Sequence, residues 1–235
     1  MSTAIVTGAS RGFGLALAIE LARAGWNLVI DARDPSDLEP ASAAVEDAGT
    51  GDVLAITGDV TEPAHAALLV DAAIEAGSFS LLVNNASMLG PSPQPRIADY
   101  PIDVLEEVLA TNLLAPLRLI QLSLPHLREV GGTVVNITSD AAVEGYEGWG
   151  GYGASKAGLE QLSNVLAAEE PSITVYWLDP GDMNTRMHQE AFPGEDISDR
   201  PRPETRVPAL LRLVEGRYPS GRYQAEDLLV EKATP

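Results

Sequence analysis

Strand-like and helix-like segments alternate along the whole chain of 235 residues. The strand-like segments are short and apolar, and helix patterns separate them. Strands separated by helices favour a parallel sheet with helices on both faces and right-handed crossovers. The sequence therefore predicts an α/β fold, a single Rossmann-type doubly wound parallel sheet of about seven strands. The strands are expected at residues 3–7, 28–31, 53–57, 81–85, 133–138, 173–178 and, as a short last strand, 222–229.

Glycines and prolines bound the expected helices, which lie at residues 15–24, 35–48, 62–76, 102–129, 152–170 and 204–215. Thr61 is expected to cap the third of these helices. Four prolines between residues 88 and 101 predict a loop, and residues 180–203 are expected to be irregular. No linker or repeat interrupts the pattern. It therefore predicts one domain over residues 1–235, with a small substrate-loop region at about residues 183–205.

Composition excludes several classes of function. The formal net charge of −19 repels phosphate backbones and anionic lipids, so neither nucleic acid nor a membrane is an expected partner. The chain has no cysteine, and its three histidines lack metal-ligand spacing, so no metal site is expected. The first expected strand begins almost at Met1, and no run of 18 apolar residues occurs. A cytoplasmic location is the resulting expectation.

Three side chains that suit proton transfer lie in one stretch. Ser139 follows a buried strand, and Tyr152 and Lys156 stand near the start of the next helix. Their four-residue spacing puts the phenol and the ammonium on one helix face. A neighbouring ammonium favours the phenolate, so we expect Lys156 to lower the pKa of Tyr152. Together the three groups can bind a carbonyl oxygen and give it a proton.

A Gly-rich turn joins the first strand to the first helix. Gly8, Gly12 and Gly14 allow the backbone to turn sharply and to approach a pyrophosphate closely. The helix that follows offers free N–H groups and the positive end of its dipole. The turn therefore predicts a dinucleotide-binding site, although its spacing differs from the Gly-x-Gly-x-x-Gly of many dehydrogenases.

The end of the second strand bears on which dinucleotide binds. Arg33 stands there, and Arg11 in the Gly-rich turn can reach the same place. Two arginines favour the 2′-phosphate of NADP. Asp31 argues against NADP, because an acid that faces the ribose would favour NAD. NADP(H) is the favoured cofactor, and NAD(H) stays possible.

The motifs together resemble those of the short-chain dehydrogenase/reductase superfamily over nearly the whole chain. The matching segments are residues 7–14 with the TGxxxGxG turn, Asp59-Val60, residues 84–87 with the NNAG motif, Asn112, Ser139 together with the YxxxK pair Tyr152 and Lys156, and residues 180–185 with the PGxxxT segment. Six matches in the right order are specific where each alone is modest. Two positions depart from the family pattern: Ser87 replaces a glycine, and Met183 stands where Val or Ile is common.

The resemblance implies an oxidoreductase with Asn112, Ser139, Tyr152 and Lys156 as catalytic residues. Ser139 would bind the substrate oxygen, Tyr152 would exchange its proton, and Lys156 would also hold the nicotinamide ribose. The cofactor-binding residues implied by the motifs and the arginines are Gly8, Ser10, Arg11, Gly12, Phe13, Gly14, Arg33, Asp59, Val60, Asn85, Ala86, Tyr152, Lys156, Pro180, Gly181, Met183 and Thr185.

Asn112 also has a local interpretation. A helical N–H at position 116 would bond its carbonyl, but Pro116 has no N–H, so the carbonyl is free for another donor. By resemblance, that donor is a water linking Lys156 to solvent as a proton relay. The alternative is a kink that only relieves packing.

The predicted reaction interconverts a ketone or aldehyde and an alcohol with NADP(H). Two alternatives stay open: a non-catalytic dinucleotide-binding sensor or scaffold, and an epimerase or dehydratase on the same fold. The candidate substrate pocket is apolar and aromatic, which suits an apolar or aromatic carbonyl compound, but such residues serve equally often in core or lid packing. The pocket residues are Leu89, Tyr146, Trp149, Met183, Met187, His188 and Phe192. The resemblance also implies a homodimer or homotetramer through the long helix and the Tyr152 helix.

Overall fold

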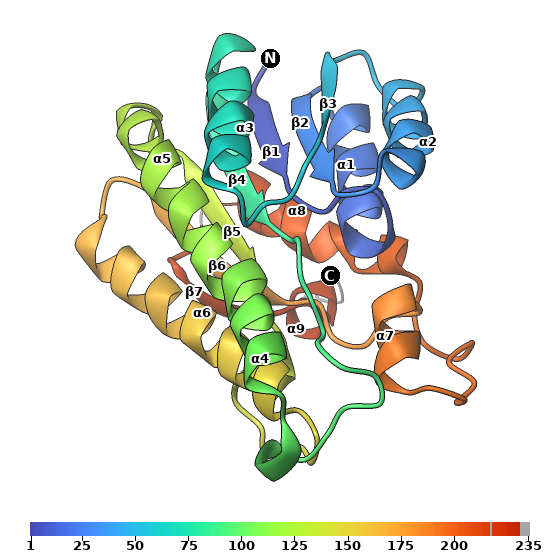
Figure 1. Cartoon of the computed structure of the whole chain (residues 1–235). Helices are drawn as coiled ribbons and strands as arrows, with labels where there is room; N and C mark the ends of the chain where they lie inside the picture. The colour runs from blue at the N-terminus through green and yellow to red at the C-terminus, as the bar shows by residue number, and fades with distance from the viewer. Residues whose placement is uncertain (217, 231–235) are drawn as a thin grey trace.

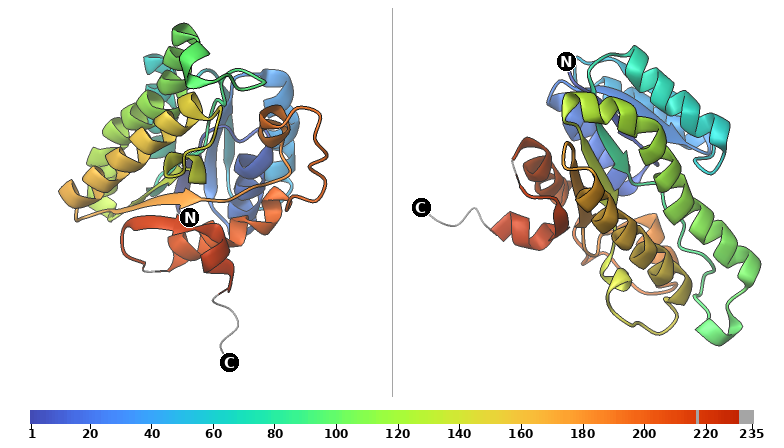
Figure 2. Two further views of the ribbon diagram at one scale, coloured as in Figure 1. Left: turned by 90° about the horizontal axis from the view of Figure 1, so that it is seen from below. Right: turned by 90° about the vertical axis from the view of Figure 1, so that its left-hand side faces the viewer.

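A computed structural model describes residues 1–216 and 218–230 and shows one sheet between two helix layers (Figures 1 and 2). The strands are β1 (Thr3–Val6), β2 (Asn27–Ala32), β3 (Val53–Thr57), β4 (Phe79–Asn84), β5 (Thr133–Ile137), β6 (Thr174–Asp179) and β7 (Gly221–Gln224). All neighbouring strands pair in parallel, in the order β3-β2-β1-β4-β5-β6-β7. The predicted fold class is confirmed.

The helices lie on both faces of this sheet. They are α1 (Gly12–Arg23), α2 (Pro35–Glu46), α3 (Pro63–Glu75), α4 (Ile102–Leu109), α5 (Ala115–Val130), α6 (Gly150–Glu169), α7 (Arg186–Ala191), α8 (Val207–Glu215) and α9 (Ala225–Val230). Short helical turns occur at Ile97–Asp99, Asp140–Ala142 and Pro203–Thr205.

Alternate strand residues face two separate cores. Ala4 and Val6 pack with α1, α2 and α8, whereas Ile5 between them packs with α3 and α5. Val134 and Val135 of β5 divide between the two cores in the same way. Successive side chains of a strand point to opposite faces, so strands that are buried on both sides read as continuous apolar runs.

The sheet reverses its winding between β1 and β4. After β1 the chain enters α1 on one face, and after β4 it continues into α4 and α5 on the other. In open α/β sheets, ligands bind outside the carboxyl ends of the strands at such a switch point. The Gly-rich turn after β1 and the Asn84–Ser87 segment after β4 therefore meet where a ligand is expected.

The long expected helix is interrupted. A π-helical turn, Ala110–Leu114, separates α4 from α5, and the N–H of Ala115 donates to the carbonyl of Ala110. Pro116 lies in the first turn of α5 and cannot donate to Asn112, which accounts for the irregular turn. The stretch Ile102–Val130 is long and apolar enough to cross a membrane by length and composition. Its α5 part packs on β4 and α3, which is the position of a core helix in this fold.

Three local predictions are wrong. Residues 225–229 form α9 and not a strand, because Ala225 and Leu228 are buried at helical spacing and acidic residues occupy the first turn. Glu62, not Thr61, is the N-cap of α3. Thr61 instead donates its N–H and its hydroxyl to Asp59 Oδ1, at 2.9 and 2.7 Å.

The third error concerns the segment after β6. Residues 180–203 were expected to be irregular, yet they contain α7. The Thr185 hydroxyl caps this helix by accepting from the N–H of His188 at 3.2 Å. A threonine three residues before the bonded N–H is a sequence signal for that cap.

Candidate active site

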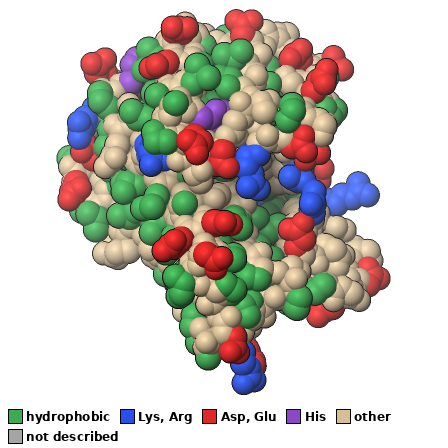
Figure 3. All heavy atoms as spheres, viewed as in Figure 1, with side chains coloured by type: hydrophobic (Ala, Val, Ile, Leu, Met, Phe, Trp, Pro, Cys, Tyr) green, Lys and Arg blue, Asp and Glu red, His purple; other side chains and the backbone are tan. Residues whose placement is uncertain are grey.

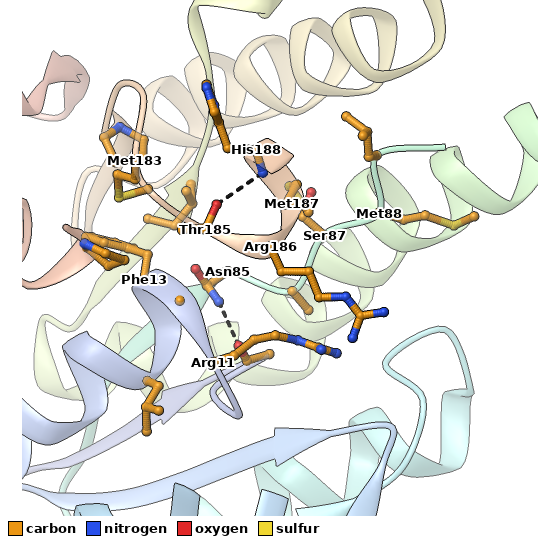
Figure 4. Close-up of a pocket in the computed structure, with 18 of the residues that line it drawn as sticks. Arg11, Phe13, Asn85, Ser87, Met88, Met183, Thr185, Arg186, Met187 and His188 are labelled. Carbon is orange, nitrogen blue, oxygen red and sulfur yellow. Dashed lines mark hydrogen bonds between the residues drawn. The ribbon is translucent and has the colours of Figure 1, made fainter. Parts of the chain in front are cut away.

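A cleft of about 1110 Å³ lies at the carboxyl ends of the strands. The turn before α1, the loop after β4, the end of β5, α6 and the segment around α7 line it. Every predicted cofactor-binding residue except Gly14 lies on its wall, as do Ser139, Tyr152 and Lys156. Figure 4 shows side chains from opposite walls, including Arg11 before α1 and Arg186 on α7, extending into the pocket region.

The Gly-rich turn fits closely against the loop after β4. A Cβ on Gly8 would lie 2.8 Å from the Cα of Ala86, and Gly8 has a left-handed φ of 64°. A Cβ on Gly14 would lie 2.4 Å from Asn85 Nδ2. Only glycine fits either position. Gly14 therefore packs against Asn85 and does not line the cleft.

The start of α1 suits a phosphate group. Its N-cap, Arg11, makes no side-chain capping bond, and no acidic residue stands in the first turn. The first N–H groups of the helix therefore lack a capping side chain and face the cleft with the positive end of the dipole. The chemistry of this wall fits the pyrophosphate of a dinucleotide.

Asn85 holds the two loops together. Its Nδ2 donates to the carbonyls of Thr7 and Gly8 at 2.8 and 3.1 Å, as Figure 4 shows for its contact with the turn. The Thr7 hydroxyl in turn accepts from the N–H groups of Asn85 and Ala86, both at 3.0 Å. These bonds fix the floor of the cleft.

Asp31 lines the cleft, but both of its carboxylate oxygens already have partners in the protein. Its side chain is almost fully buried, and Oδ1 accepts from the N–H of Gly8 at 2.7 Å. Its Oδ2 lies 3.0 Å from Nε2 of His65. Both oxygens are therefore occupied behind the turn. The other charged residues on this part of the wall are the exposed Arg33 and Arg11 together with Asp34, Asp37 and Asp59, and Arg11 Nη1 lies 3.2 Å from Asp37.

Tyr152 and Lys156 project from the first turns of α6 into the same end of the cleft. Burial raises the pKa of Tyr152 to about 12, a hydrogen bond from Ser87 opposes this shift, and the charges of Asp179 and Asp140 add to it. Burial lowers the pKa of Lys156 to about 8. Both ionised forms are disfavoured because the site excludes water.

Burial thus dominates the pKa of Tyr152 in this geometry, and the predicted lowering of that pKa by Lys156 stays a prediction. The Lys156 ammonium donates to the carbonyl of Ile137 at 2.8 Å. It lies 5.6 Å from the centroid of the Tyr152 ring. Helical spacing brings the two side chains together, but it does not determine which oxygen the ammonium contacts.

Ser139 stands at the end of β5, within the same part of the cleft. Its hydroxyl donates to Asp140 Oδ1 at 2.9 Å and accepts from the N–H of Ala141 at 3.2 Å. Asp140 Oδ2 also accepts from the Tyr146 hydroxyl at 2.9 Å. The Ser139 hydroxyl must rotate away from Asp140 before it can donate to a carbonyl oxygen.

Asn112 is fully buried and does not line the cleft. Its Oδ1 accepts from Met88 N–H at 2.7 Å and from the Ser87 hydroxyl at 3.2 Å. Its Nδ2 donates to Met88 carbonyl at 2.8 Å and to Ser155 Oγ at 2.9 Å. The side chain thus joins the loop after β4 to α6, next to Tyr152. The predicted role of its backbone carbonyl in holding a water stays a prediction.

The predicted substrate residues divide into two groups. Leu89, Trp149, Met183, Met187 and His188 line the cleft. Tyr146 is 47% exposed and borders a separate shallow hollow beside Arg96. Phe192 packs on the rings of Trp149 and His188, with centroids 5.9 and 4.9 Å away, and supports the wall from behind.

A charged network beneath the catalytic end was not predicted. Arg222 of β7 donates to Glu160 of α6 at 2.9 Å and to Asp179 at the end of β6 at 3.2 Å. It also reaches the carbonyl of Ser139 at 3.4 Å. The acid that directly precedes Pro180-Gly181 was the available signal in the sequence, but its partner on β7 is 43 residues away.

Comparisons with known proteins agree with this geometry. The family model described as short chain dehydrogenase matches residues 2–196. Short chain dehydrogenase penD of Penicillium thymicola is 33% identical over 209 residues, which cover 84% of this chain and 76% of that protein. Mouse (Mus musculus) sepiapterin reductase is 34% identical over 210 residues, with 80% and 76% covered.

A solved structure extends the similarity to the fold. The alcohol dehydrogenase of the archaeon Thermococcus sibiricus, complexed with 5-hydroxy-NADP, superposes with a TM-score of 0.85 at 25% identity, over 95% of both chains. The family model, the order of the strands and the residues of the cleft all indicate the same family. The chain belongs to the short-chain dehydrogenase family, whose members are oxidoreductases that bind NAD or NADP.

Proposed function

We propose that the protein is an NADP(H)-dependent enzyme that interconverts a ketone or aldehyde and an alcohol. The observation that carries the proposal is the convergence of Ser139, Tyr152 and Lys156 at one end of the cleft. The Gly-rich turn and the uncapped start of α1 stand on the wall of the same cleft. A proton donor and a dinucleotide site then share one cavity, as carbonyl reduction requires.

The bound dinucleotide supplies or accepts the hydride, and the side chains handle the oxygen and its proton. With a pKa of about 12, Tyr152 is a neutral phenol at pH 7 and is ready to donate its proton in reduction. Ser139, once rotated from Asp140, donates a hydrogen bond to the substrate oxygen. Lys156 supplies a buried donor beside Tyr152 that is charged below a pH of about 8.

Tyr152→Phe tests this role most directly. The variant keeps the ring that packs with Leu89 and Ala141 but lacks the proton. We expect a loss of at least about a hundredfold in kcat, as for removal of a positioned acid. NADPH binding, followed by fluorescence titration, should stay within a few-fold of the native value. Turnover at the native rate would refute the proposal.

The arginines at the ribose end support NADP. Arg11 and Arg33 both line the cleft; Asp31 lines it too, but its two carboxylate oxygens already have Gly8 and His65 as partners. Figure 3 shows basic side chains gathered beside a hollow on a face otherwise rich in carboxylates. The related Thermococcus enzyme was solved with an NADP analogue.

Arg33→Ala measures this preference. Loss of a charge-assisted bond to a phosphate should weaken NADPH binding by roughly tenfold or more and leave NADH binding nearly unchanged. Isothermal titration with both cofactors gives the ratio. An equal loss for both would assign Arg33 a structural role and favour NAD(H) as the alternative cofactor.

We also propose that the chain acts as one domain, with residues 183–205 as the substrate loop, and that it forms homodimers or homotetramers. Leu122 of α5 and Val165 of α6 are 40% and 39% exposed, and Leu114 before α5 is 50% exposed. Such apolar residues on two helices suit a contact with a second copy. Light scattering that gives the mass of one chain would contradict this assembly.

A further inference from the structure

Asp140 directly follows Ser139 and lines the catalytic end of the cleft. We propose that Asp140 determines substrate specificity by selecting carbonyl compounds with a hydrogen-bond donor, a hydroxyl or an amine, on the carbon next to the carbonyl. The proposal rests on the proposed function, because it names a substrate class for that reaction. It also gives a way in which the Ser139 hydroxyl becomes free to bind the substrate oxygen.

The carboxylate of Asp140 bonds two hydroxyl groups, one on each oxygen. Oδ2 accepts from the Tyr146 hydroxyl at 2.9 Å, and Oδ1 accepts from the Ser139 hydroxyl at 2.9 Å. Ser139 Oγ itself accepts from the N–H of Ala141 at 3.2 Å. A hydroxyl has one proton to donate. In this arrangement Ser139 gives that proton to Asp140, so none is left for a substrate oxygen.

A substrate oxygen must therefore compete with a carboxylate for the Ser139 proton. Hydrogen bonds to an ionised acceptor are roughly twice as strong as bonds between neutral groups, so a plain carbonyl oxygen competes poorly. A substrate that carries its own donor changes this balance, because the donor can bond Oδ1 of Asp140 in place of Ser139. The Ser139 hydroxyl then rotates onto the carbonyl oxygen, and the carboxylate keeps a partner on each oxygen.

The place of the donor on the substrate follows from the partner that the two oxygens share. Asp140 Oδ1 and the bound carbonyl oxygen would each lie within one hydrogen bond of Ser139 Oγ. A donor on the next carbon stays close to the carbonyl oxygen and can reach Oδ1, whereas a donor on a longer chain must first be ordered. The donor keeps its proton, so the hydride and proton transferred are those of the proposed reaction.

The charges around Asp140 favour a donor at this position over an anion. Among the described residues, no arginine, lysine or histidine pairs with the Asp140 carboxylate. Lys156 instead donates to the carbonyl of Ile137. Arg222 pairs with Asp179. A carboxylate without a cation attracts a hydroxyl or an ammonium group and repels an anionic substituent.

The test compares kcat/KM for α-hydroxyacetophenone and α-methoxyacetophenone, with the full-length protein and NADPH. The two ketones share the ring and the carbonyl, but a methoxy oxygen cannot donate. Their phenyl ring suits Leu89 and Trp149, which line the same cleft. Hydroxyacetone and methoxyacetone extend the comparison to a small pair. We expect the hydroxy ketone to be preferred by roughly tenfold or more, as for a bond to a charged group.

Asp140→Ala should bring this ratio close to one by changing both values. The hydroxy ketone loses its acceptor, so its kcat/KM falls. The methoxy ketone gains, because the Ser139 hydroxyl no longer bonds a carboxylate. A merely structural role would lower both values together. The Asp140 carbonyl accepts from the N–H groups of Val143 and Glu144, and alanine keeps these backbone bonds.

Two further variants separate the contact from charge and from folding. Asp140→Asn keeps the size and an oxygen acceptor but lacks the charge, so its ratio should lie between those of the native protein and the alanine variant. Glu144→Ala removes a charge from the same loop. The Glu144 side chain is exposed and lies outside the cleft wall, so the native ratio should persist.

The outcomes distinguish this proposal from the proposed function. A native ratio near one overturns the substrate class, and a native ratio that persists in both Asp140 variants overturns the role of Asp140. In either case, loss of activity in Tyr152→Phe leaves the enzyme assignment in place. If Glu144→Ala lowers the ratio as far as Asp140→Ala, general charge is responsible and the role is also overturned. If the native protein reduces none of the four ketones with NADPH or NADH, the proposed function and the substrate class fall together.

Discussion

Asp31 and Asp179 occupy equivalent places in two distant parts of the sheet. Each stands at the end of its strand, β2 or β6, and each accepts from the N–H of a glycine in a loop that lines the cleft. Asp31 Oδ1 lies 2.7 Å from the nitrogen of Gly8, and Asp179 Oδ1 lies 2.9 Å from that of Gly181. Both glycines are left-handed, with φ of 64° and 72°. The same arrangement thus shapes two walls of the cleft. We call the wall formed by the Gly8 turn the cofactor wall, and the wall formed by Gly181 and the end of β6 the catalytic wall.

The two carboxylates differ in the second partner. Asp31 Oδ2 meets His65, and both side chains are almost completely buried. Asp179 Oδ2 meets Arg222, which is partly exposed and also holds Glu160. A histidine can be neutral, whereas an arginine stays charged. The cofactor wall is therefore fixed by a single buried contact between two side chains, and the catalytic wall by an ionic network that spans β6, β7 and α6.

Replacement of Asp31 should have the largest effect. Asp31→Ala leaves a buried N–H on Gly8 and a buried ring nitrogen on His65 without partners. We expect a loss of about 3 kcal/mol in the free energy of unfolding, measured by urea denaturation, because each orphaned group keeps its desolvation cost. Dinucleotide binding should weaken too, since the turn loses its anchor.

Asp31→Asn is the matched control. Its amide oxygen can still accept from Gly8, and its NH₂ can donate to the ring nitrogen of His65 that faces it. We expect well under half of the loss seen with alanine. Asp31→Ala should also lose more unfolding free energy than Asp179→Ala. If it does not, the two walls are equally anchored.

Replacement of Arg222 should have an intermediate effect, and on a different quantity. Arg222→Met leaves Asp179 and Glu160 without their shared cation and removes the contact with the Ser139 carbonyl. We expect about 1–2 kcal/mol of destabilisation, reduced by the partial exposure of the site, and a several-fold lower kcat. The dissociation constant for the dinucleotide should stay near the native value.

Arg222→Lys tests the geometry of that network. A lysine keeps the charge but lacks the planar group that reaches several acceptors, so it should recover only part of kcat. A dinucleotide affinity that falls as far as in Asp31→Ala would contradict the separation of the two walls.

The fold and the conformation of the Gly-rich turn were largely predictable from the sequence. Apolar strand runs and the Gly8 turn depend on local chemistry, since only glycine permits that φ and that approach to Ala86. The seven-stranded sheet is confirmed in the structure. Errors occurred where two conformations compete over a few residues, as at Ala225, where a strand was expected and a helix forms.

The catalytic end was less predictable for a physical reason. Spacing placed Tyr152 and Lys156 on one helix face, but burial determines their charge, and burial is a property of the assembled fold. The partner of Asp31 is 34 residues away, so the side to which its carboxylate turns could not be deduced locally. The bond between Ser87 and Asn112 depends likewise on the assembled loops.

The smallest effect is expected for Asp179→Asn, and its sign depends on pH. Burial raises the pKa of Asp179, and the bonds from Gly181 and Arg222 offset this only in part. The folded protein therefore holds a proton there more tightly than the unfolded chain does. As pH rises from the ordinary aspartate value near 4 through the raised pKa, the native protein loses stability relative to the asparagine variant.

At pH 7, Asp179→Asn should accordingly lie within about 1 kcal/mol of the native free energy of unfolding, because loss of the ion pair and relief of the buried charge oppose each other. On acidification to pH 5 the free energy of unfolding of the native protein should rise relative to that of the variant. Urea unfolding of both proteins at the two pH values measures this difference. If acidification instead lowers the free energy of unfolding of the native protein relative to the variant, Arg222 outweighs burial in setting the pKa of Asp179. The carboxylate of Asp179 would then be anchored as firmly as that of Asp31.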